Sequence, residues 1–160
     1  MSYSIVISIA SQSLAVYHQQ KRLCAYVIST ALNGVGSEKN TGKTPLGLLC
    51  IRAKIGRDQP INTVFVGRRT TGEIYSADLA KQCPKRDWVL SRIMWLSGKE
   101  VGINRLGNVD TMQRYIYIHG TPNSEPMGVP LSHGCIRMRN EDVIALFDLI
   151  PVGTEVTIQP

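Results

Sequence analysis

The sequence predicts a mainly β domain, a sandwich or distorted barrel, with one main helix near the C-terminus. Short apolar segments recur along the chain with the two-residue alternation of strands, beginning with Ile5, Ile7 and Ile9. Only residues 140–150 have the i, i+3, i+4, i+7 apolar spacing of an amphipathic helix. Strands and helices do not alternate as they do in parallel α/β folds, which favours a β-rich architecture with a late helix packed on it.

The strands are predicted from alternation, β-branched and aromatic residues, and flanking turn residues. The first three span 4–9, 13–18 and 23–30, and polar residues 19–22 turn the second into the third. Further strands are expected at 48–55, 62–69, 87–96, 113–119 and 154–158, and 72–76 extends the 62–69 strand beyond a turn. The 87–96 segment has the length of either a helix or a strand, and its alternation favours a strand.

The helix is predicted over residues 140–150. Asn140 is the expected N-cap, and Glu141 and Asp142 follow in the first turn, where the helix dipole favours acidic side chains. Pro151 and Gly153 end the helix. The apolar stripe comprises Val143, Leu146, Phe147 and Ile150.

Composition narrows the function classes. Residues 1–160 are expected to form a single domain, with 43% hydrophobic residues and no repeat or linker. The net charge of +6 suits an acidic partner, but scattered basic residues without interleaved aromatics argue against nucleic acid. The N-terminal segment lacks the pattern of a signal peptide, and no apolar run approaches the roughly 18 residues that span a bilayer. We therefore expect a cytoplasmic protein that binds neither nucleic acid nor membrane.

The four cysteines, Cys24, Cys50, Cys83 and Cys135, show no spacing typical of a disulfide framework. Reduced thiols are expected in the absence of an export signal. Cys24 and Cys50 lie in apolar strand segments and are predicted core residues. Cys83 receives no predicted role, which leaves Cys135 for closer inspection.

Residues 36–44, GSEKNTGKT, are similar to a phosphate-binding P-loop. Five residues instead of four separate Gly36 from the Gly42-Lys43 pair, and Gly47 falls in the first turn of the helix that should follow. We interpret the segment as a surface loop, so no nucleotide cofactor is expected.

A metal site is the second alternative. His119, His133 and Cys135 are ligand types that zinc accepts. A structural zinc site needs four ligands, and the only other histidine, His18, lies in an early strand. We therefore expect no metal and no other cofactor.

Cys135 is a candidate nucleophile. Gly134 gives the backbone freedom to direct N–H groups at one point, as an oxyanion hole requires. The thiolate is the reactive form, and a histidine can take its proton. In an extended segment His133 faces the same side as Cys135, with about 6.6 Å between Cα atoms. His119 ends a strand, and a partner strand would bring it opposite Cys135 at about 5 Å. The geometry leaves both histidines open, with a small preference for His119.

The segment IHGT…PLSHGCIRM, residues 118–138, resembles the signature of the L,D-transpeptidase catalytic-domain family. The opening strands, the loop NTGKTPLG (40–47) and the closing segment FDLIPVGTEVTI (147–158) are also similar, so the resemblance covers nearly the whole chain. Caspases share an upstream His-Gly and a later cysteine. Their histidine lies much farther upstream, however, and their Gln-Ala-Cys pattern is absent here.

The resemblance implies a role for each site residue. Cys135 would be the nucleophile, His119 the general base and acid, and the backbone carbonyl of Ser132 would orient the His119 ring. Arg137 would hold the substrate or its carboxylate. The oxyanion hole would be formed by the backbone N–H groups of His133, Gly134 and Cys135.

The resemblance also implies a substrate, the stem peptides of peptidoglycan. Family members attack the bond between the L-centre of a diamino acid and a terminal D-alanine, form a thioester, and are expected targets of carbapenems. Water as acceptor gives a trimmed tripeptide, and an amine from another stem gives a cross-link. Most members are exported, whereas this sequence lacks the pattern of a signal peptide. We therefore expect a cytoplasmic L,D-carboxypeptidase of peptidoglycan recycling, with wall cross-linking as the alternative. A non-catalytic module that binds muropeptides or nucleic acid would need neither His119 nor Cys135.

Overall fold

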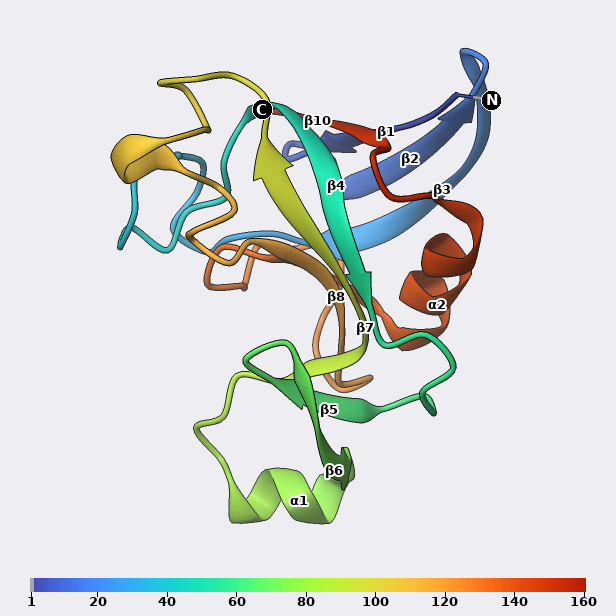
Figure 1. The fold of residues 1–160 in the computed structure, drawn as a ribbon. Coiled ribbons are helices and arrows are strands. Elements are labelled where there is room, and N and C mark those ends of the chain that lie inside the picture. The colour runs from blue at the N-terminus through green and yellow to red at the C-terminus, as the bar shows by residue number, and fades with distance from the viewer. Residues whose placement is uncertain (1) are drawn as a thin grey trace.

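Ten strands form one sheet in the computed structural model, which describes residues 2–160 (Figure 1). Their order is β4-β10-β1-β2-β3-β9-β8-β7-β5-β6, and β4 also pairs with β7, so the run from β4 to β7 closes into a barrel. The strands are β1 (Tyr3–Ser8), β2 (Ser13–His18), β3 (Lys21–Ser29), β4 (Gly47–Ile55), β5 (Thr63–Val66), β6 (Arg69–Ile74), β7 (Val89–Gly98), β8 (Tyr117–Thr121), β9 (Ile136–Arg139) and β10 (Glu155–Gln159). The predicted mainly β class is confirmed, in its barrel form.

The main core fills the space between the barrel and the helix α2 (Asn140–Leu149). Alternate residues of the strands point inward, as Ile5 and Ile7 do from β1. Val143, Leu146 and Phe147 supply the buried stripe of α2, which packs against β7, β8 and β9 (Figure 1). The predicted helix is confirmed, and it covers the strands that carry the site described below.

A small lobe extends from one end of β7 (Figure 1). It contains the β5–β6 hairpin and a short helix, α1 (Ala77–Gln82), whose Ser76 side chain accepts a hydrogen bond from Leu79 N. Trp88, Val64 and Leu90 form its separate apolar cluster. A 3-10 turn (Gly107–Val109) lies in the loop after β7.

Two predicted boundaries are shifted by positive backbone φ angles. The predicted turn at 19–22 is limited to Gln19 and Gln20, with φ of 51° and 69°, and Lys21 already begins β3. The predicted strand at 113–119 begins only at Tyr117, because Tyr115 has φ of 56° and residues 111–115 form turns. A residue in this region of φ breaks the extended backbone that a strand requires.

Asn140 is wrongly predicted as the N-cap of α2. Arg139 occupies that position, and Asn140 is the first helical residue and is fully buried. Its side-chain oxygen accepts from Ser91 Oγ at 2.7 Å, and its amide nitrogen donates to Thr121 O at 2.9 Å and Asn62 Oδ1 at 3.1 Å. The side chain therefore ties the start of the helix to β7, to β8 and to the loop before β5.

The Asn140→Ala variant is expected to lose about 2–4 kcal/mol of unfolding free energy, because buried partners such as Ser91 and Thr121 are left without this amide. Urea denaturation with an unchanged m value measures it. Asn108→Ala, at an exposed position, is the matched control and should change stability by less than about 0.5 kcal/mol. Equal stabilities for the two variants would contradict the role assigned to Asn140.

Candidate active site

The parallel pairing of β8 with β9 assembles the site. His119 pairs with Arg137, and Ile118 pairs with Ile136. Side chains alternate across a strand, so Cys135 lies on the same face as Arg137, two residues away. Cys135 is therefore opposite Tyr117, and His119 is one step along that face. The expected position of His119 directly opposite Cys135 is wrong by two residues, because the long 122–135 loop returns the chain parallel to β8.

These residues line a pocket of about 190 Å³. Its walls come from the segment before β7, the turn before β8, the Ser-His-Gly-Cys loop and the two parallel strands. The lining residues are Asp87, Arg114, Tyr115, Ile116, His119, Ser132, His133, Cys135 and Arg137. Every residue assigned a side-chain role from the sequence is thus in one pocket, and Ser132 and His133 are there too.

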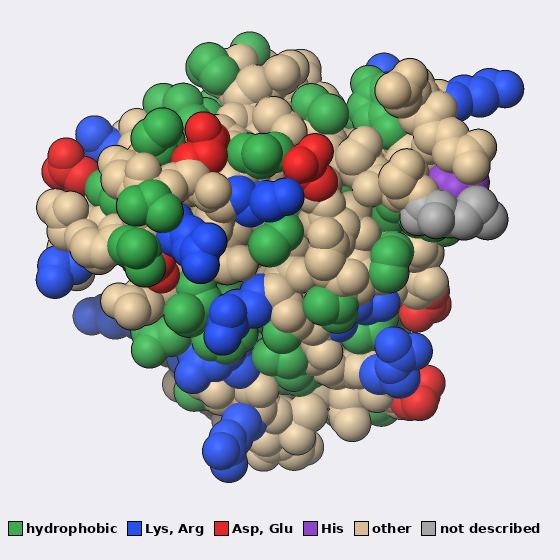
Figure 2. Space-filling view, turned by 45° about the horizontal axis from the view of Figure 1, so that its top comes forward, with side chains coloured by type: hydrophobic (Ala, Val, Ile, Leu, Met, Phe, Trp, Pro, Cys, Tyr) green, Lys and Arg blue, Asp and Glu red, His purple; other side chains and the backbone are tan. Residues whose placement is uncertain are grey.

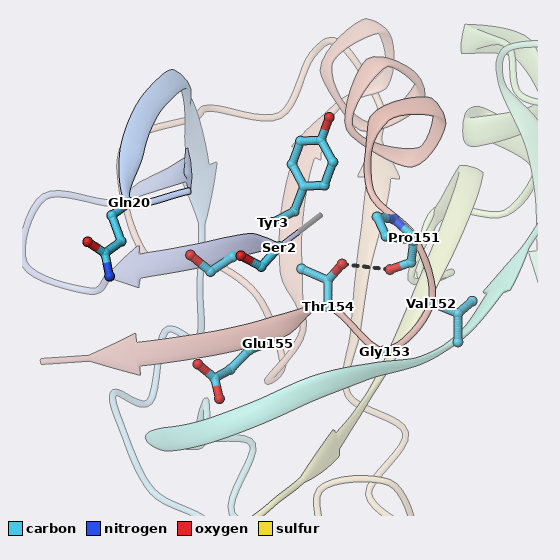
Figure 3. A pocket seen from close by; sticks show the side chains of 9 residues that line it. Ser2, Tyr3, Gln20, Pro151, Val152, Gly153, Thr154 and Glu155 are labelled. Carbon is cyan, nitrogen blue, oxygen red and sulfur yellow. Dashed lines mark hydrogen bonds between the residues drawn. The ribbon is translucent and has the colours of Figure 1, made fainter. Parts of the chain in front are cut away.

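A larger pocket of about 520 Å³ lies between the start of β1 and the turn before β10 (Figure 3). Its lining contains hydroxyl groups such as that of Thr154, which donates to Pro151 O at 2.7 Å. Among residues 2–160, the one charged residue that lines it is Glu155, which is paired with Lys99 at 3.4 Å. No cysteine or histidine of this described range lines it, so its size does not make it the better candidate for nucleophilic chemistry.

The Cys135 sulfur lies between a backbone N–H of β8 and a backbone carbonyl of the turn before it. It accepts from Tyr117 N at 3.3 Å and donates to Tyr115 O at 3.4 Å. Burial raises the pKa of the Cys135 thiol to about 12, while the Tyr117 N–H and the guanidinium groups of Arg137 and Arg114 act in the opposite direction. The resting group is therefore the thiol, and reaction requires a base that removes its proton.

His119 has the properties of that base. Its side chain is buried, and burial lowers the pKa of the imidazole below its ordinary value of 6.5, so the ring is neutral at pH 7. Its Nδ1 lies 2.7 Å from Gly120 O, and a carbonyl oxygen only accepts. This contact assigns the proton to Nδ1 and leaves the lone pair of Nε2 free to take a proton.

The carbonyl that fixes the His119 ring differs from the expected one. Gly120 supplies it, whereas Ser132 O accepts from Leu32 N at 3.0 Å. Gly120 is adjacent to the histidine, so its carbonyl reaches Nδ1 without a second loop. The Ser132 side chain instead braces its own loop, because its Oγ donates to Cys135 O at 2.6 Å and accepts from Gly134 N at 3.2 Å.

The predicted oxyanion hole is only partly open in this state. The N–H of Gly134 is engaged by Ser132 Oγ at 3.2 Å, so this one of the three expected donors already has a partner. Gly134 has φ of 132°, and a Cβ there would come within 3.3 Å of Ile116 Cδ1. The φ angle favours glycine at this position, and a Cβ would also require the Ile116 side chain to shift slightly.

Thr44 holds the Ser-His-Gly-Cys loop (132–135) from the other side. Its Oγ1 donates to Gly134 O at 3.0 Å and accepts from Ala31 N at 3.0 Å. Thr44 belongs to the segment that resembles a P-loop, and it is fully buried. This segment, which we interpret from sequence as a surface loop, therefore also supports the site.

An ion-pair group borders the pocket. Arg137 Nη2 lies 3.2 Å from Asp87 Oδ1, and its Nη1 lies 3.9 Å from Glu125 Oε2. His133 Nδ1 lies 3.5 Å from Asp87 Oδ2, and the His133 side chain is 75% exposed. His133 thus faces solvent and Asp87. Asp87 has no sequence motif around it, and sequence analysis does not identify it.

Among residues 2–160, no group of three or more His, Cys, Asp or Glu side chains is arranged to hold a metal ion. The four cysteines are free thiols. In the same part of the chain, no helix has the length and apolar character needed to cross a membrane.

The curated proteins that the chain matches are named as L,D-transpeptidases. The chain is 44% identical over 63 residues to the putative L,D-transpeptidase YqjB of Bacillus subtilis, which covers 39% of the chain and 34% of that protein. It is 51% identical over 116 residues to the probable L,D-transpeptidase YbiS of Escherichia coli, which covers 70% of the chain and 35% of that protein. The chain therefore spans about a third of the length of these relatives.

Solved structures share the fold. The L,D-transpeptidase LdtMt1 in complex with imipenem aligns with a TM-score of 0.59 at 19% identity, over 99% of this chain and 59% of that one. L,D-transpeptidase 3 from Mycobacterium tuberculosis, with a faropenem-derived adduct, aligns with a TM-score of 0.60 at 16% identity, over 99% of this chain and 60% of that one. The family model of the L,D-transpeptidase catalytic domain (YkuD) matches residues 2–158, and the chain therefore belongs to this family.

Proposed function

We propose that the chain catalyses cysteine-dependent acyl transfer on peptidoglycan stem peptides, with Cys135 as nucleophile and His119 as general base. The observation that carries the proposal is that a thiol and a buried, neutral imidazole line the same pocket. Cys135 directly precedes β9, and His119 lies in the adjacent parallel strand β8. The substrate class follows from membership of the L,D-transpeptidase catalytic domain family.

In the first half-reaction, His119 Nε2 takes the proton of Cys135 Sγ as the sulfur attacks the carbonyl carbon of the L-centre. The C=O electrons move to the oxygen, which the backbone N–H groups of His133 and Cys135 would stabilise. When the C–N bond breaks, His119 returns the proton to the nitrogen of the leaving D-alanine. The product is a thioester on Cys135, and the Gly120 carbonyl stabilises the imidazolium formed between these steps.

In the second half-reaction, we propose water as the main acceptor. His119 takes a proton from water, the hydroxyl oxygen attacks the thioester carbon, and the Cys135 sulfur leaves and recovers its proton. Water is far more concentrated than soluble stem peptides, which supports this outcome. The protein would then act as an L,D-carboxypeptidase of peptidoglycan recycling. The cytoplasmic location stays a prediction, which fractionation of cells that express the chromosomal gene can test.

The acceptor is tested by product analysis. Purified protein receives a disaccharide tetrapeptide alone, and then the tetrapeptide with an amine acceptor, and mass spectrometry identifies the products. We expect tripeptide as the main product in both reactions. Predominantly cross-linked dimer would assign the transpeptidase outcome instead. No turnover by folded protein in either reaction would contradict acyl transfer on these peptides.

A carbapenem separates the enzyme from a binding module. We propose that imipenem acylates Cys135, which adds the mass of the drug to one cysteine. A module that only binds muropeptides or nucleic acid would remain unmodified. Peptide mapping that finds the adduct on another cysteine would count against Cys135 as the nucleophile.

A further inference from the structure

The two arginines that line the Cys135 pocket differ in charge compensation. Arg137 is paired with the carboxylates of Asp87 and Glu125. Arg114 donates to two backbone carbonyls, Lys43 O at 2.6 Å and Gly36 O at 3.2 Å. Among residues 2–160, no Asp or Glu oxygen forms an ion pair with Arg114. Neutral carbonyls fix a guanidinium without cancelling its charge, so Arg114 is the uncompensated cation of the pocket.

A second pocket, of about 370 Å³, borders the first. The two share four lining residues, among them Arg114 and His133. Lys39 adds a second cation, and no carboxylate among residues 2–160 lines this pocket. Its lining residues are Lys39, Asn40, Gly42, Gln113, Arg114, Tyr115, Ile116 and His133. The side of the Cys135 pocket that borders this second pocket is thus positive.

The surroundings of Arg114 suit a bound anion. The side chain is only partly exposed, and burial lowers the pKa of its guanidinium, although the charge is retained at any physiological pH. Its carbonyl partners use two of the five guanidinium N–H groups, so three remain. A partly desolvated cation without a partner is unfavourable until an anion binds it.

We infer that Arg114, with Lys39 at the rim, forms an anion subsite that holds a carboxylate of the peptide substrate. The inference rests on the proposed function, because stem peptides supply the carboxylates. It moves this role from Arg137, whose charge Asp87 and Glu125 already compensate. Arg114 is thereby a residue that determines substrate preference, and its two backbone bonds hold the 36–43 loop in place around the anion.

The other surface charges are scattered, so Arg114 provides a local positive charge that they do not. On the face seen in Figure 2, Lys and Arg side chains are scattered among apolar and acidic ones. The net charge of +6 therefore does not by itself direct an anion to one place. A local subsite is needed, and charges separated by more than about 8 Å are screened at physiological ionic strength.

The first test measures the electrostatic potential at Cys135 in the absence of substrate. Iodoacetate and iodoacetamide alkylate the same thiol and differ in a carboxylate. We expect Arg114→Gln to lower the ratio of their rates at Cys135, read by peptide mass mapping, by about fivefold. Lys39→Gln should lower it less, and Arg114→Lys should retain most of it. Lys39 makes no side-chain hydrogen bond among residues 2–160, so this variant remains informative if Arg114→Gln fails to fold.

Arg22→Gln is the matched control. Arg22 is exposed on β3, about 23 Å along the strand from Ser29, the residue that pairs with Arg137. Arg22→Gln removes one positive charge outside the pocket, so the ratio of the iodoacetate rate to the iodoacetamide rate should stay at the wild-type value. A ratio that is equal in Arg114→Gln, Lys39→Gln and wild type would overturn the anion subsite.

The second test uses tetrapeptide turnover. Arg114→Gln should raise KM about ten- to hundredfold with little change in kcat, as expected for loss of a charged hydrogen bond to substrate. For a tetrapeptide with amidated carboxyl groups, wild type and Arg114→Gln should have the same KM. Unchanged KM would overturn the inference and leave the proposed function standing. If wild type does not turn over the tetrapeptide but the alkylation ratio depends on Arg114, the proposed function fails and the subsite stands.

Discussion

The Cys135→Ala variant is expected to lose all measurable turnover of the tetrapeptide and to remain folded. Alanine removes the sulfur that is proposed to form the thioester, and among residues 2–160 no other cysteine lines the pocket. The lost packing is small, because Cys135 lies at the edge of the cluster of Phe65, Ile93 and Tyr117 and is itself only half-buried. Turnover is measured by mass spectrometry of the tripeptide, and folding by circular dichroism and thermal unfolding.

Three other thiols provide matched controls for that loss. Cys24 packs on the main core, Cys50 lies 3.3 Å from Ser97 Oγ, and Cys83 packs on the lobe cluster. The corresponding single alanine variants should retain catalysis, with moderate changes in stability. Residual turnover by folded Cys135→Ala, or complete loss in one of the other three variants, would remove the mechanistic basis of the proposal.

Local patterns in the sequence predict most strands and the position of α2, because each depends on periodicity within one segment. They do not predict α1, which has six residues and no buried side chain, and so carries no apolar stripe. They also miss β9, whose four residues follow directly from the glycine-containing turn at Gly134. Short elements like these are formed by their neighbours in the fold.

The site residues also divide into those that local patterns predict and those that they miss. The motif predicts Cys135 and His119 as candidate catalytic residues, and the resemblance to the family implies their roles. The register of β8 on β9 is a long-range property, so the sequence places His119 opposite the wrong residue. Asp87 reaches Arg137 from a loop 50 positions earlier in the chain, and no local pattern marks such a partner.

Buried polar residues are the hardest to predict, because their hydrogen bonds cross the fold. Asn140 has the sequence context of an N-cap, yet its amide joins three separate segments. Thr44 lies in a glycine-rich loop, yet its hydroxyl supports the Ser-His-Gly-Cys loop by donating to Gly134 O. In both positions the tertiary partner, and not the local propensity, determines the role of the side chain.

Replacing His119 with glutamine is expected to lower kcat/KM by about 10²–10⁴-fold, because glutamine cannot take the thiol proton. His133→Gln is the matched control, and a much smaller change is expected. The His133 side chain is 75% exposed and lies beside Asp87, whereas His119 is buried with Nδ1 fixed on Gly120. Equal loss in both variants would leave the base unassigned, and loss in His133→Gln alone would transfer the role to His133.

The pH profile provides an independent check on His119. Burial lowers the pKa of the imidazole, so the wild-type kcat/KM should fall on the acid side at a pH below 6.5, the ordinary value for histidine. The same shift affects stability, because the unfolded chain binds the proton more readily than the folded one. The stabilisation is complete above pH 6.5 and is lost as the pH falls through the lowered pKa of folded His119. His133→Gln should keep this acid limb, and His119→Gln should abolish it in the residual activity. An acid limb that persists in His119→Gln would show that another group is the titrating base.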